Sequence, residues 1–98
     1  MKKQDADLFE TYEKQIRGMY NEISLLSKKK PDAPVNKFKL KFINEILKKV
    51  NNLLGSKYMP FDGFTVFDED ELPTVSDVVF MLYQYLRCMD KFSDDELR

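Results

Sequence analysis

The sequence contains no histidine, a single cysteine and three glycines among its 98 residues. Histidine is the commonest general base and metal ligand, so its absence weighs against catalysis and metal binding. The lone thiol, Cys88, has no second cysteine for an internal disulfide, which favours a reducing, cytoplasmic setting. The glycines stand apart at positions 18, 55 and 63, so no glycine-rich loop is present to hold a phosphate. We expect no cofactor.

Long apolar runs are also missing. None approaches the roughly 18 to 20 residues that cross a membrane. The N-terminal segment turns acidic after two lysines and has no apolar stretch, unlike a secretory signal. We therefore expect a cytoplasmic protein without a membrane span. A chain of 98 residues suits one domain with one hydrophobic core.

Three stretches carry apolar residues at steps of three and four, the spacing that places side chains on one helix face. We predict helices over residues 5–28, 35–54 and 75–92. The apolar arc of the last covers about half of the circumference, so we expect the other two helices to pack around it. The sequence therefore predicts one all-α domain over residues 1–98, a small antiparallel three-helix bundle.

Turn and cap residues separate these stretches. Pro31 and Pro34 frame a short connector, and either Asp32 or Asn36 is placed to cap the second helix. Gly55 follows its last apolar residue, as a C-cap does. Thr74 or Ser76 is the expected N-cap of the third helix. Within the first helix, Gly18 is a weak point, and either it serves a close helix crossing or it only lowers helix stability.

The segment between the second and third predicted helices, residues 55–73, is long for a connector in a small bundle. It is rich in aromatic residues, which are costly to leave in water, so we expect it to fold back over the bundle. Its end is a run of four acids, residues 68–71, which either binds a divalent cation or is a solvated charge run. On the second helix, we place Asn44 and Asn51 on the polar side, away from the core.

The C-terminal residues have a pattern of their own. Ser93 and Glu96 have the spacing of a capping box, which usually opens a helix. Either this is a frayed tail, or the chain is the N-terminal part of a larger helical domain. If the chain continues past Arg98, a catalytic function located beyond it is one reading, with this chain as a fragment of an enzyme.

Charge is distributed in blocks. Residues 28–57 hold nine lysines against two acids, and residues 58–98 hold ten acids against three basic residues. The blocks either complement each other within the fold or mark interaction surfaces. Exposed lysines are able to contact nucleic-acid phosphates, although arginine, the side chain best suited to base reading, is scarce. This candidate basic patch comprises Lys28, Lys29, Lys30, Lys37, Lys41 and Lys48.

Aromatic residues on the polar side of the third helix suggest a protein-interaction surface. Phe80 and Tyr83 lie there, one turn apart, with Arg87 one turn further on. Either the aromatic loop covers Phe80 or a partner does, and a second copy of the chain is the simplest partner. We predict a non-catalytic protein-interaction or regulatory module, with a nucleic-acid-associated regulator as the alternative. The candidate interaction surface comprises Phe80, Tyr83, Arg87, Phe61, Phe64 and Phe67.

Overall fold

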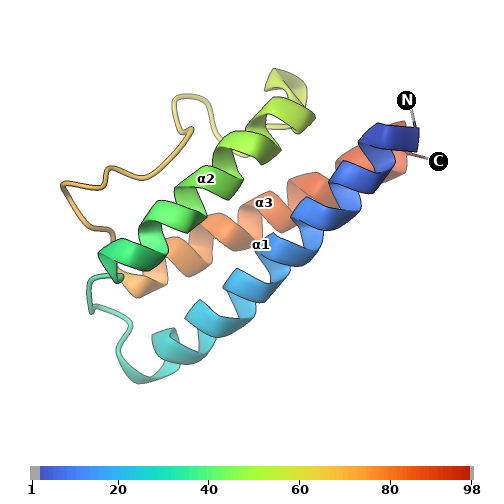
Figure 1. Ribbon diagram of the computed structural model, residues 1–98. Coiled ribbons are helices and arrows are strands. Elements are labelled where there is room, and N and C mark those ends of the chain that lie inside the picture. Colours follow the sequence, from blue (N-terminus) through green and yellow to red (C-terminus); the bar gives the residue numbers. More distant parts are fainter. Residues whose placement is uncertain (1–2, 98) are drawn as a thin grey trace.

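The described part of the chain folds into three α-helices, and the all-α bundle predicted from the sequence is confirmed (Figure 1). A computed structural model describes residues 3–97. Helix α1 spans Lys3–Lys29, α2 spans Lys37–Leu54 and α3 spans Val75–Glu96, with a short 3-10 turn, η1, at Ser56–Tyr58. The predicted helices lie within these bounds except at the start of α2, which begins two residues later than expected.

The apolar stripes of the three helices meet in one core. The fully buried side chains come from all three helices, so each contributes one face to the interior. Tyr85 is the largest of them. The others are Ile16, Ile23, Leu40, Ile43, Leu47, Val50, Val78, Leu82 and Met89.

The caps of α2 and α3 follow the sequence closely. The side chain of Asn36 accepts a hydrogen bond from the backbone N–H of Lys39 and so caps α2. Gly55 ends the same helix with a φ of 71°, a conformation that glycine adopts without strain. Thr74 caps α3, and Asp77 completes the capping box by accepting from the Thr74 N–H.

The helix directions differ from the antiparallel arrangement that we expected. Backbone hydrogen bonds tie the residues before α2 to those before α3: Val35 N–H donates to Pro73 O at 2.9 Å, and Val75 N–H donates to Ala33 O at 2.8 Å. Both helices therefore start at the same end and run parallel, while α1 runs opposite to both (Figure 1). The reason is the long loop, which returns along the full length of α2 before α3 begins.

Two asparagines of α2 hold that loop in place. The Asn44 side chain donates to the carbonyl of Phe67 at 2.9 Å and accepts from the Phe67 N–H at 3.0 Å. Two turns later, Asn51 donates to the carbonyl of Thr65 at 2.8 Å and accepts from the Tyr85 hydroxyl at 2.6 Å. Asn44 is only 2% exposed. Our placement of these two residues on a solvated polar side is therefore wrong, because the loop covers that flank of α2.

Two further expectations are corrected by the backbone. Helix α3 continues through Ser93 to Glu96, and the Ser93 carbonyl accepts from Leu97 N–H, so Ser93 does not open a new helix. The last turn is held by Tyr58, whose hydroxyl donates to Asp95 at 3.2 Å. Gly18 is exposed, and a Cβ added there would meet no atom within 4 Å, so it serves no close crossing.

Candidate interaction surface

Four of the predicted interaction residues gather on the outer side of α3. The ring of Phe61, from the loop, stacks on Phe80 with centroids 6.0 Å apart and planes 15° apart. The loop covers Phe80 only in part, since Phe80 remains 54% exposed and Phe61 43%. The guanidinium of Arg87 lies over the Tyr83 ring at 6.0 Å. We call Phe61, Phe80, Tyr83 and Arg87 the aromatic cluster.

The other two predicted residues, Phe64 and Phe67, do not belong to this surface. Phe67 is buried, and Phe64 packs half-buried against the core. Their rings meet edge to face at 5.1 Å, and Phe64 also contacts Tyr85. Both aromatics anchor the loop, as expected for the segment, and Phe67 is too deeply buried to meet a partner. The burial of Phe67 contradicts its place on the predicted surface, because spacing in the sequence does not distinguish an anchor from an exposed ring.

A second exposed apolar surface lies along the seam between α1 and α2, and sequence reasoning did not select it. Phe38 is 70% exposed and Leu25 64%. Phe42 and Leu26 are also exposed, and the Phe38 and Phe42 rings meet edge to face at 5.0 Å. The signal lies in a second apolar stripe of α2, formed by Phe38, Phe42, Ile46 and Leu53. Ile46 in this stripe is buried, whereas Phe38 and Phe42 stay exposed.

This seam is hollowed into a continuous groove. Four depressions with volumes of about 340, 400, 130 and 570 Å³ follow one another along it, and each shares lining residues with the next. Successive depressions share Leu26, Lys29 and Lys39 at one end, Glu22 and Lys39 in the middle, and Met19, Glu22 and Phe42 at the other end. We call this the α1–α2 groove; its main lining residues are Met19, Glu22, Leu25, Leu26, Phe38 and Phe42.

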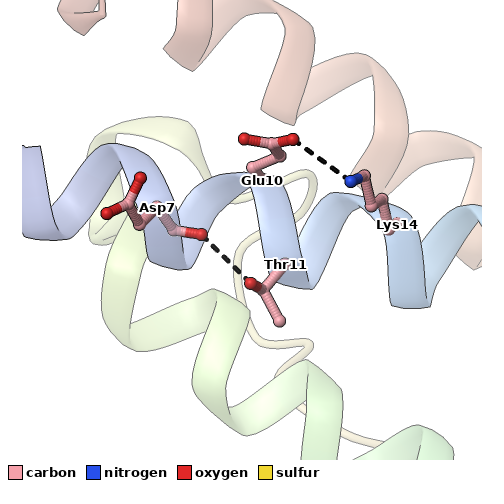
Figure 2. Close-up of polar contacts among 4 residues, drawn as sticks. All are labelled: Asp7, Glu10, Thr11 and Lys14. Carbon is pink, nitrogen blue, oxygen red and sulfur yellow. Dashed lines mark hydrogen bonds and ion pairs between the residues drawn. The ribbon is translucent and has the colours of Figure 1, made fainter.

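Lysines dominate the charge around the groove. Five lysines and two glutamates line its four depressions. Glu22 pairs with Lys39 across the groove at 3.6 Å. At the far end, Lys14 is already paired with Glu10 at 3.1 Å, one turn before it on α1 (Figure 2). The lysines that lie at the other end are Lys28, Lys29 and Lys30.

The predicted basic patch is divided between the end of α1, which carries Lys28 and Lys29 with Lys30 just after it, and one flank of α2. At about 100° per residue, Lys37, Lys41 and Lys48 fall in one stripe, beside the asparagines that hold the loop. Phe38 and Phe42 lie on the opposite flank, facing α1. All six lysines of the patch are exposed, but only Lys28, Lys29 and Lys30 border the groove. The patch is therefore two separate lysine groups rather than one surface.

The acidic run at residues 68–71 is the candidate cation site. The carboxylate of Asp68 accepts from the backbone N–H groups of Asp70 and Glu71, so it folds the acidic run on itself. Within residues 3–97, no group of three or more His, Cys, Asp or Glu side chains is arranged to hold a metal.

Cys88 packs half-buried against the core, and burial raises the pKa of its thiol, while Arg87 lowers that pKa to a smaller extent. A raised pKa keeps the thiol protonated and weakly nucleophilic.

None of the helices in the described part of the chain is both long and apolar enough to span a bilayer. Comparison with protein-family models, with curated proteins and with solved structures finds no match to this chain.

Proposed function

We propose that this chain is a non-catalytic protein-interaction module of the cytoplasm, and that it binds its partner in the α1–α2 groove. The observation that carries the proposal is Phe38, a phenylalanine 70% exposed at the edge of a hollowed apolar seam. Large exposed aromatics beside pockets are typical of residues that dominate binding energy at interfaces. The half-buried, unpaired thiol of Cys88 is compatible with a reducing compartment.

The architecture supports this choice of surface. Helix α3 and the loop cover two sides of the helix pair, and the outer side of the α1–α2 seam has no cover among the described residues. In a four-helix bundle, that position is filled by another helix, which buries the apolar residues of both neighbours. The groove thus has the shape and chemistry of a site for an additional helix.

Affinity capture from the cells that make the protein tests the proposal. Full-length protein, a Phe38→Glu variant and a Phe80→Glu variant serve as matched baits, because both substitutions place a carboxylate at an exposed phenylalanine. We expect bound proteins that the Phe38→Glu bait loses and the Phe80→Glu bait keeps. Identical protein sets for all three baits would contradict a function of the groove.

A second candidate, homodimerisation, is favoured by the aromatic cluster. Phe80 and Phe61 stack on each other and still present their outer edges to solvent. A two-fold dimer would place each cluster on its copy, and aromatic contacts would supply most of the affinity. Light scattering over a range of concentrations measures the oligomeric state. A dimer that Phe80→Glu converts to a folded monomer supports homodimerisation. A monomer at every concentration contradicts it.

Nucleic-acid binding remains the weaker alternative. The lysines proposed for it form two groups, one at the end of α1 and one on a flank of α2, so a single nucleic-acid strand would contact only part of them.

A further inference from the structure

We infer that the occupant of the α1–α2 groove is an acidic amphipathic helix from another protein. The inference rests on the proposed function and adds the chemistry of the partner. Three features of the groove carry it: its length, the depth of one end and its charge.

The length of the groove fits a helix of about four turns. Its lining on α1 runs from Lys14 to Lys29, which at about 1.5 Å per residue spans about 22 Å. A helix of about 15 residues covers that distance. Such ligands insert apolar side chains at positions i, i+3 or i+4, and i+7 into the groove. Met19, Leu26 and Phe42 are spread along the groove to meet those anchors.

One end of the groove reaches the core. The depression of about 340 Å³ there is walled by Ile23, Val35 and Val75, which are themselves almost fully buried. A leucine or aromatic side chain entering it would contact these buried residues on its inner side. Pockets of this kind hold the central anchors of protein interfaces. We therefore place the strongest anchor of the partner helix at this end.

The charge of the groove selects an acidic partner. Lys29, Lys30 and Lys39 all border the deep depression, and only Lys39 is paired, with Glu22, among the ion pairs of the described residues. Helix α2 begins at the same end, and its first turn carries no acidic side chain to offset the positive helix dipole. The negative end of the α1 dipole also lies there, but its last turn carries Lys28 and Lys29. Carboxylates flanking the anchors of the ligand would lie against this positive rim, which favours encounter and orientation.

A second copy of the chain fits the groove less well. Pairing groove to groove would bring two net positive surfaces together, which opposes association. Placing the acidic region 58–98 of one copy on the groove of another joins two different surfaces, and contacts of that type form rings or open chains rather than dimers. A different protein therefore complements the groove better.

A displayed peptide library tests the inference. It consists of alanine-based helices of about 18 residues, in which anchor positions i, i+3 and i+7 vary among leucine, isoleucine and phenylalanine. The flanking positions vary between glutamate and lysine. The full-length protein selects binders, and the Phe38→Glu variant removes those that do not use the groove. We expect glutamate to be enriched over lysine beside the anchors.

Two lysine variants then measure the charge contribution. Lys29→Gln with Lys30→Gln removes two charges at the deep end of the groove, and we expect the selected peptides to bind about tenfold more weakly. Lys41→Gln with Lys48→Gln removes two charges on the other flank of α2 and should leave binding unchanged. Circular dichroism of each variant confirms that it is folded.

The outcomes separate the two proposals. Selected peptides that favour lysine, or that bind both lysine variants equally, would overturn the acidic partner and leave the groove as a binding site. A selection in which no peptide distinguishes the wild type from Phe38→Glu would overturn the groove itself. Self-association that Phe38→Glu abolishes would show that a second copy, rather than an acidic helix, fills the groove.

Discussion

The side-chain amide of Asn44 makes two hydrogen bonds to the backbone of Phe67, one as donor at 2.9 Å and one as acceptor at 3.0 Å. A neighbouring β-strand would satisfy the same two backbone groups in the same way. The buried Asn44 side chain thus satisfies both backbone groups of a loop residue that lies 23 positions later in the sequence. These two bonds hold the loop against α2. The loop in turn fixes the path by which α3 returns to run parallel to α2.

We predict that Asn44→Ala lowers the free energy of unfolding by about 2 to 4 kcal/mol, because it leaves two buried backbone groups of Phe67 without partners. Chemical denaturation measures the change. Asn52→Ala, on the exposed side of the same helix, is the matched control and should have little effect. Equal losses from both variants would show that the contact does not hold the loop.

We predict that Gly18→Ala raises the free energy of unfolding by about 0.5 to 1 kcal/mol. The position is helical and exposed, and an added Cβ meets no atom within 4 Å, so only the conformational cost of glycine is removed. Gly55→Ala is the contrasting variant: its φ of 71° strains any side chain, so stability should fall. Thermal or chemical unfolding that ranks the two variants in the opposite order would contradict this.

Alkaline pH provides a test of the burial of Tyr85. Burial raises the pKa of this phenol from 10.0 to about 12, although its hydrogen bond to Asn51 lowers it in part. Below pH 10 both folded and unfolded states keep the proton, and stability is unaffected. Between the two pKa values the unfolded state ionises first, so the free energy of unfolding falls by about 2 to 3 kcal/mol as the pH rises.

The matched control for this pH effect is Tyr85→Phe, which lacks the ionising group. Other tyrosines and the lysines titrate alike in both proteins, so the difference between their alkaline stability curves isolates Tyr85. We expect the free energy of unfolding of the wild type to fall relative to that of Tyr85→Phe as the pH rises from about 10 to about 12. A constant difference across that range would mean that the phenol is accessible to water.

Local signals in the sequence predicted the helices and most of their ends. The caps at Asn36, Gly55 and Thr74 act through residues within four positions of themselves, so a short stretch of sequence contains both partners. Ser93 shows the limit of the same reasoning. A serine followed by glutamate three residues later also occurs inside a helix, and packing of Phe92 against Phe9 and Tyr58 keeps α3 helical there.

The relationships that the sequence did not reveal are those between distant residues. The sequence around Asn44 is typical of a solvated polar residue, because its partner Phe67 lies 23 positions later. Phe38 and Phe42 form an apolar stripe that periodicity assigns to the interior, and only the position of α1 leaves them exposed. The aromatic cluster was anticipated because Phe80 and Tyr83 break the polar pattern of their own helix. The groove left a signal only in the apolar stripe of α2, and that stripe alone does not show that α1 leaves Phe38 and Phe42 exposed.

Site-specific photo-cross-linking tests the groove most directly. A benzophenone amino acid replaces Phe38 at the groove or, as control, Phe61 in the aromatic cluster, since both rings are exposed. Irradiation in the cells that make the protein should join the residue at position 38, and not that at position 61, to a different protein. Adducts from position 61 alone, or adducts from position 38 only with further copies of this chain, would contradict the account.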